Sequence, residues 1–143
     1  HGTKHSFPTR RSSDLTMAGL DVTEKALVFP TDFERIRALG NPVAKVVAEW
    51  LDFFYGFHRS IGYAGAPVHD AVAVASLVRP ELMKTEEMYV QIELTGDYCR
   101  GATVGDRLGI WKKPANARCI LDIDRQGFVD LLAEAARSYG EGA

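Results

Sequence analysis

Cysteine is scarce in this sequence, and its two cysteines do not have the spacing of a metal or redox motif. Cys99 and Cys119 are the only cysteines among 143 residues. They are too few for a disulfide framework and too far apart for a zinc site or a Cys-x-x-Cys pair. We expect both to be buried thiols in a reducing compartment, which predicts a cytoplasmic protein.

Long apolar runs and a strong excess of one charge are also missing. No apolar run approaches the roughly 20 residues that are needed to span a bilayer, and the formal net charge is only -2. The sequence therefore predicts neither a membrane nor a nucleic-acid partner. Its 46% hydrophobic and 25% charged residues are typical of a single globular domain.

Residues 1–14 differ from the rest of the sequence. They are polar and basic, show no periodicity and lack the apolar core of a signal peptide. The stretch from Phe7 to Leu15 resembles a translated sequencing-adaptor sequence. We therefore predict a non-native or disordered leader over residues 1–14 and one domain portion over 15–143. A basic arm for an anionic partner is the alternative interpretation of the leader.

The stretch from Gly62 to Val78 organises the rest of the chain. A loop with two glycines and a proline delivers His69 and Asp70 to a segment, 71–78, in which only Ser76 is polar. A helix that is apolar on all sides is normally a buried one. We therefore expect a buried helix with a histidine and an aspartate at its start.

Two interpretations of this pair remain open. Asp70 is either an N-cap for the helix, with His69 a surface residue, or an oxygen ligand for a hard cation beside a proton-transferring His69. The positive end of the helix dipole disfavours an imidazolium. A general-acid His69 would therefore need a nearby anion, which the sequence does not reveal.

The remaining pattern alternates between strands and helices, which indicates an α/β layered fold. Thr31, Asn41 and Asp124 are placed to cap helices, and the alternation of apolar and polar residues from Met88 to Leu94 is typical of a half-buried strand. The predicted strands are Leu15–Val22, Met88–Leu94, Arg100–Val104 (forming a hairpin with the strand before it) and Arg118–Ile123; the predicted helices are 30–39, 42–58 and the segment after Asp124.

Helix 42–58 carries two apolar stripes. Trp50 and Phe54 lie on the wider stripe, and we expect them to pack in the core. Phe53, Phe57 and Ile61 form a second stripe at four-residue spacing, which runs toward the loop before His69.

Several motifs occur in the order and spacing of one known family. The segment Gly65–Ala71, Gly-Ala-Pro-Val-His-Asp-Ala, resembles the His-Asp motif near the C-terminal end of the inosine-uridine preferring nucleoside hydrolases. Further matching segments are Met17–Thr23, which contains Gly-Leu-Asp-Val-Thr, together with Lys84–Val90, Gly101–Val104 and Lys113–Asn116. The similarity extends from about Leu15 to about Tyr139.

The resemblance implies a fold and a chemistry. It implies the C-terminal part of a Rossmann-like nucleoside hydrolase fold with an added β-hairpin, from a ribonucleoside N-ribohydrolase that releases ribose and free base. Asp70 would be one ligand of a Ca²⁺ ion, and His69 would be the catalytic acid for the departing base. The family's aspartate-rich opening, Asp-x-Asp-x-Gly-x-Asp-Asp, is missing from this sequence, so we expect this chain to be inactive alone.

The resemblance also implies a base pocket and an assembly. Phe53, Phe57, Ile61 and His69 would lie at the nucleobase, where family members often carry polar or tyrosine side chains. An apolar wall of this kind stacks on a base without hydrogen-bonding to it. The parent enzyme would be a homotetramer or homodimer. The alternatives are an HD-type metal phosphohydrolase, which the strand 88–94 disfavours because that class is all-helical, and a non-catalytic interaction domain.

Overall fold

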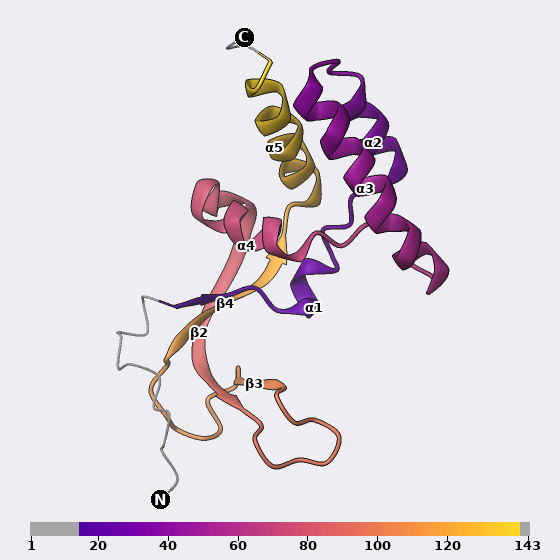
Figure 1. Ribbon diagram of the computed structural model, residues 1–143. Helices are drawn as coiled ribbons and strands as arrows, with labels where there is room; N and C mark the ends of the chain where they lie inside the picture. Colours follow the sequence, from indigo (N-terminus) through magenta and orange to yellow (C-terminus); the bar gives the residue numbers. More distant parts are fainter. Residues whose placement is uncertain (1–14, 141–143) are drawn as a thin grey trace, which may run out of the picture. The chain divides into compact units, whose positions relative to one another are not determined.

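The computed structural model describes residues 15–140 as a mixed α/β chain (Figure 1). The predicted leader, residues 1–14, lies outside the described residues. The elements in chain order are β1 Thr16–Met17, α1 Leu20–Thr23, α2 Pro30–Arg37, α3 Pro42–Ser60, α4 His69–Val78, the short 3₁₀ helix η2 Pro80–Leu82, β2 Met83–Ile92, β3 Thr103–Asp106, β4 Ala117–Ile123 and α5 Arg125–Ser138.

The strands of the described residues form one mixed sheet in the order β1-β4-β2-β3. Strand β1 is parallel to β4, with Thr16 opposite Arg118. Strands β2 and β3 are antiparallel, with Tyr89 opposite Asp106. The predicted hairpin is therefore confirmed, although its second strand begins at Thr103, and the predicted third strand corresponds to β4.

The chain divides into two compact units. The first contains β1 and residues 85–121, and its small buried cluster includes Met88, Ala117 and Cys119. Cys119 is buried as expected, whereas Cys99 is exposed. The prediction that both thiols are buried is wrong for Cys99, because it lies in the turn region that joins β2 to β3, where water reaches the side chain.

The second unit contains every helix of the described residues and most of the buried core. Helices α2 and α3 pack together and both contact α5. Their buried residues include Phe33, Ile36, Ala48 and Phe128. None of these helices combines the length and the apolar composition required to cross a bilayer.

Local capping chemistry sets where two of these helices begin. Asn41 accepts a hydrogen bond from the Ala44 amide at 2.8 Å at the start of α3, and Asp124 accepts one from the Gly127 amide at 3.1 Å at the start of α5. Each side chain satisfies an amide that has no partner within its helix. The caps predicted at Asn41 and Asp124 are confirmed, whereas the cap predicted at Thr31 is wrong, because α2 begins at Pro30 with Phe29 as its N-cap.

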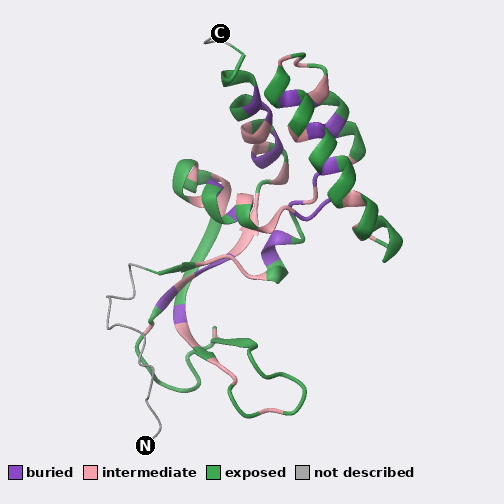
Figure 2. Cartoon of the chain, in the orientation of Figure 1, coloured by how far each residue is buried: buried purple, intermediate pink, exposed green. Residues whose placement is uncertain are grey.

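Two predictions about the elements are wrong. The strand predicted over Leu15–Val22 ends at Met17, and the following residues form helix α1. The helix predicted as buried, α4, has two buried residues, Val72 and Ala75, whereas Leu77 is 81% exposed. Figure 2 shows much of α4 in the colour of exposed residues. An apolar composition on all sides gives no periodicity that selects the buried face, and here only one side of α4 meets neighbouring helices.

Candidate active site

The loop before α4 is fixed by a backbone bridge to a distant segment. Val28 and Ala66 exchange hydrogen bonds through their backbone amides and carbonyls, at 3.0 and 2.8 Å. Gly65 lies against the same segment: a Cβ atom built on Gly65 would be 2.7 Å from the Val28 carbonyl oxygen and 2.8 Å from a ring carbon of Phe29. The motif that precedes His69 thus requires a glycine at position 65 for close approach.

Replacing Gly65 by alanine should therefore lower stability. We expect a loss of about 1–3 kcal/mol, the usual range for overpacking a closely packed site. Gly56 is the matched control, because nothing lies within 4 Å of its virtual Cβ and Gly56→Ala within α3 should stabilise by about 0.5–1 kcal/mol. Urea unfolding of both variants measures the two effects, and equal shifts of the midpoint would contradict the expectation.

His69 is the first residue of α4 and is half-buried. Its Nδ1 atom lies 2.7 Å from the hydroxyl oxygen of Thr23, at the end of α1. Thr23 is 1% exposed, so this contact is largely shielded from water. The sequence did not predict a contact between Thr23 and His69. Its one indication was that Thr23 and His69 each fall in a segment that matches the same family.

Asp70 is the second residue of α4 and is exposed. The N-cap of the helix is Val68, and no side chain caps this helix. The interpretation of Asp70 as an N-cap is therefore wrong, because the helix begins at His69, two residues before the start that this role requires. Within residues 15–140, no hydrogen bond or ion pair engages the Asp70 carboxylate.

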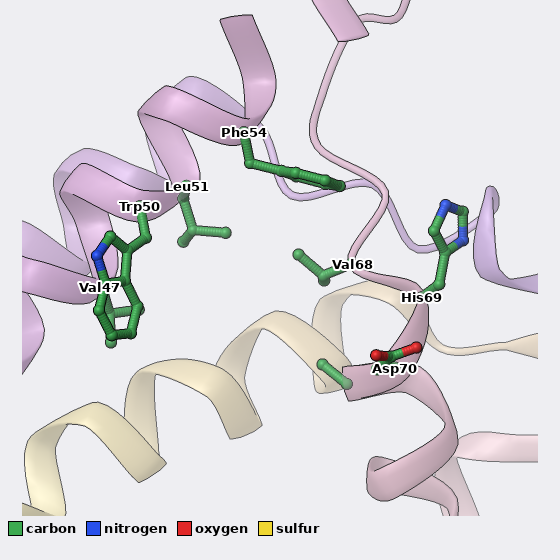
Figure 3. A pocket seen from close by; sticks show the side chains of 8 residues that line it. Val47, Trp50, Leu51, Phe54, Val68, His69 and Asp70 are labelled. Carbon is green, nitrogen blue, oxygen red and sulfur yellow. The ribbon is translucent and has the colours of Figure 1, made fainter. Parts of the chain in front are cut away.

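A cavity of about 440 Å³ lies beside these two residues (Figure 3). One wall is the apolar side of α3 and the other is the beginning of α4. The lining residues are Val47, Trp50, Leu51, Phe54, Val68, His69, Asp70 and Ala71. The site thus combines an aromatic wall with one imidazole and one carboxylate, a composition common among small-molecule sites.

The prediction that Trp50 and Phe54 pack in the core is wrong. Trp50 is 69% exposed and Phe54 39% exposed, and both line the cavity (Figure 3). The periodicity correctly places them on the apolar side of α3. However, only part of that side, which includes Ala48 and Leu51, is buried in the core that α3 shares with α2 and α5, whereas Trp50 and Phe54 stay exposed.

The second stripe of α3 does not line this cavity. Phe53, Phe57 and Ile61 are 88%, 65% and 57% exposed, respectively, and none is among the cavity residues. The structure therefore brings His69 and Asp70 together with Trp50 and Phe54, and not with this stripe. The assignment of Phe53, Phe57 and Ile61 to a base pocket stays a prediction.

The donor set for a metal ion is incomplete in the part of the chain that the structure describes. No group of three or more His, Cys, Asp or Glu side chains is close enough to hold an ion there. Asp70 offers one carboxylate that has no partner among residues 15–140, whereas calcium takes six to eight oxygen ligands. Asp70 therefore suits one position in a calcium shell, and the described residues do not supply the others.

A second contact joins the end of α1 to the loop before α4. The Tyr63 hydroxyl donates a hydrogen bond to the Glu24 carboxylate at 2.7 Å. This bond to a carboxylate raises the pKa of Tyr63 above that of ordinary tyrosine, because the phenol loses a favourable contact when it ionises. Neighbouring residues at the end of α1, Thr23 and Glu24, thus hold the two ends of the loop that leads to His69.

The Tyr63 contact predicts a pH effect. Because the pKa of Tyr63 is raised on folding, its contribution to stability is present below the ordinary tyrosine pKa of about 10 and is lost as pH rises through the raised value. Glu24→Gln should move the pKa of Tyr63 back toward the ordinary value. Ultraviolet titration of the phenolate measures the pKa of Tyr63, and Tyr63→Phe identifies which part of the titration curve belongs to this residue. A titration curve that is unchanged in Glu24→Gln would contradict the prediction.

Comparison with known proteins assigns the fold and the family. A purine-preferring ribonucleoside hydrolase from Gardnerella vaginalis superposes with a TM-score of 0.72 at 26% identity, over 85% of this chain and 40% of that one. A plant nucleoside hydrolase superposes with a TM-score of 0.74 at 22% identity. The fold is thus an α/β fold shared with nucleoside hydrolases. The model of the inosine-uridine preferring nucleoside hydrolase family matches residues 4–130, and the chain belongs to this family.

Curated relatives support the same assignment. The pyrimidine-specific ribonucleoside hydrolase RihA of Salmonella newport is 49% identical over 127 residues, which are 87% of this chain and 41% of that protein. The protein of the same name from Shewanella woodyi is 47% identical over the same share. The chain therefore spans about 41% of the length of the curated relatives it matches.

Proposed function

We propose that the parent enzyme of this chain hydrolyses the N-glycosidic bond of ribonucleosides, giving ribose and free base. The observation that carries the proposal is the position of His69: it lies at an open cavity with its Nδ1 held by Thr23, in a chain of the nucleoside hydrolase family. Glycosidic cleavage builds negative charge on the departing base, and a positioned imidazole relieves that charge by donating a hydrogen bond or a proton.

Each predicted site residue has a role in this proposal. His69 is the acid for the leaving base, and Asp70 is one ligand of Ca²⁺. When bound, this ion would orient the ribose hydroxyls and lower the pKa of the attacking water. Phe53, Phe57 and Ile61 remain proposed neighbours of the base.

The proposal also covers the compartment, the metabolic role and the oligomeric state of the enzyme. We propose that it acts in the cytoplasm, in the salvage and catabolism of purine and pyrimidine nucleosides, as a homodimer or homotetramer. The relatives differ in the base that their names give: pyrimidine for RihA of Salmonella newport and purine for the protein of Gardnerella vaginalis. Uridine and inosine are therefore the two substrates to compare.

The 143-residue chain alone should not release ribose from either nucleoside. Asp70 is the only proposed calcium ligand in it, and the described residues contain no group of three metal-binding side chains. A reducing-sugar assay on the purified chain with calcium measures this. Ribose release above the level of a His69→Ala sample would contradict the expectation.

A chimera tests the function itself. The segment of the Salmonella newport protein that matches this chain would be replaced by this chain's own residues, which are 49% identical to it. We expect the chimera to release ribose from a nucleoside in the presence of calcium. The unchanged Salmonella protein is the positive control. A chimera that is folded by circular dichroism but inactive on both uridine and inosine would overturn the proposal.

A further inference from the structure

Thr23 is a buried hydroxyl whose short contact is with the proposed catalytic histidine. Its oxygen lies 2.7 Å from His69 Nδ1 and 3.5 Å from the Leu20 carbonyl oxygen. The two residues are 46 positions apart in the sequence, so the contact is a product of the fold and not of local chain geometry. Thr23 does not line the cavity, which means that any part it has in the chemistry must act through His69.

The geometry indicates which atom carries the hydrogen of this contact. At 2.7 Å the contact is a hydrogen bond in either direction, because the ring nitrogen donates in one tautomer and accepts in the other. The competing acceptor, the Leu20 carbonyl, lies at the limit of hydrogen-bond distance and already accepts from the Glu24 amide at 3.1 Å. If Nδ1–H donated to Thr23, the hydroxyl hydrogen would have only this distant carbonyl as an acceptor, so the arrangement in which Thr23 donates to His69 Nδ1 gives the hydroxyl the better bond.

We propose that Thr23 is a positioning residue for His69, and that its hydroxyl holds the neutral imidazole as the tautomer with hydrogen on Nε2. A nitrogen that accepts a hydrogen bond cannot carry the ring hydrogen, so in the neutral ring that hydrogen lies on the other nitrogen. Nε2 has no partner among the described residues and is left as a donor in a side chain that lines the cavity. The catalytic meaning of this arrangement rests on the proposed function.

A hydroxyl is able both to donate and to accept a hydrogen bond. In the neutral ring, donation by Thr23 leaves Nε2–H as the group offered to a ligand. A valine at this position keeps the shape and loses both abilities, whereas serine retains them.

Nitrogen NMR of the 143-residue chain, labelled with ¹⁵N-histidine, tests the proposal without any assay of activity. The ring-nitrogen signals that disappear in the His69→Gln variant are assigned to His69. At pH about 8.5, where ordinary imidazoles are neutral, we expect His69 Nε2 to show the shift of an N–H nitrogen and Nδ1 that of a bare, hydrogen-bonded nitrogen. If the wild-type spectrum instead shows that Nδ1 carries the hydrogen, this result alone overturns the proposal.

Variants then test whether Thr23 is the cause. Thr23→Val should shift Nδ1 to the position of a bare nitrogen without a hydrogen-bond donor, and Thr23→Ser should restore the wild-type shift. Thr31→Val is the matched control, because Thr31 is exposed and should leave both ring shifts unchanged. If Thr23→Val does not fold, Thr23→Ala takes its place. A His69 spectrum unchanged by loss of the hydroxyl contradicts the proposal.

The chimera separates this inference from the proposed function. There, Thr23→Val should lower kcat with little change in KM, and Thr23→Ser should recover kcat. An inactive chimera combined with the expected nitrogen shifts would refute the hydrolase function and leave the Thr23–His69 pairing standing. An active chimera with the hydrogen on Nδ1 would refute the pairing alone.

Discussion

Replacing His69 by alanine in the chimera with the Salmonella newport protein should lower kcat/KM for nucleosides by about 10²–10⁴-fold, the usual contribution of a general acid. The physical reason is that a purine or pyrimidine anion is a poor leaving group, and His69 is a side chain at the cavity that is able to donate a proton or hydrogen bond to it. Steady-state kinetics with uridine and inosine measure the loss.

The leaving group distinguishes an acid from a merely structural histidine. With 4-nitrophenyl riboside, whose leaving group departs without protonation, His69→Ala should lose little activity. His58→Ala is the matched control: His58 packs against Phe54 and Tyr63 but does not line the cavity, and its loss should leave both substrates within a few-fold of wild type. An equal loss on both substrates in His69→Ala would contradict the acid role.

Replacing Phe33 by alanine should remove much of the stability of the chain. Phe33 is fully buried between helices α2 and α3 and contacts Tyr55 edge to face, with 5.9 Å between ring centroids. Deleting a buried phenylalanine costs about 3–5 kcal/mol, a large fraction of the 5–15 kcal/mol that is typical of a domain. Urea unfolding followed by circular dichroism measures the change.

Phe53 provides the control for this experiment within the neighbouring helix. It is 88% exposed, so Phe53→Ala should change the unfolding free energy by no more than about 0.5 kcal/mol. Similar losses in Phe33→Ala and Phe53→Ala would mean that Phe53 is covered in solution, and would contradict the assignment of the core to the α2–α3 contact.

The features that the sequence predicted well are governed by local chemistry. Asn41 and Asp124 each cap a helix through an amide three residues away, and the hairpin follows from alternation and a turn within one stretch. The position of His69 and Asp70 at the start of a helix was predicted for the same reason. In each case the interacting groups are neighbours along the chain.

The features that it missed depend on distant parts of the chain. The partner of His69 is Thr23, which no spacing rule connects to it. The exposure of Leu77 and Trp50 depends on which neighbours cover them, and residue type does not specify this. The stripe of Phe53, Phe57 and Ile61 does not line the cavity beside His69, and its place at a nucleobase stays a prediction.

Helix α1 has a consequence for protein engineering. Adjacent residues, Thr23 and Glu24, contact His69 and Tyr63 respectively, and the bridge between Val28 and Ala66 joins the same two segments. Residues 20–28 and 63–69 thus form one module, although about 35 positions separate them along the chain. Recombination between homologous enzymes should place its crossover points outside residues 20–69, because a junction within that range would pair a loop from one parent with anchors from the other.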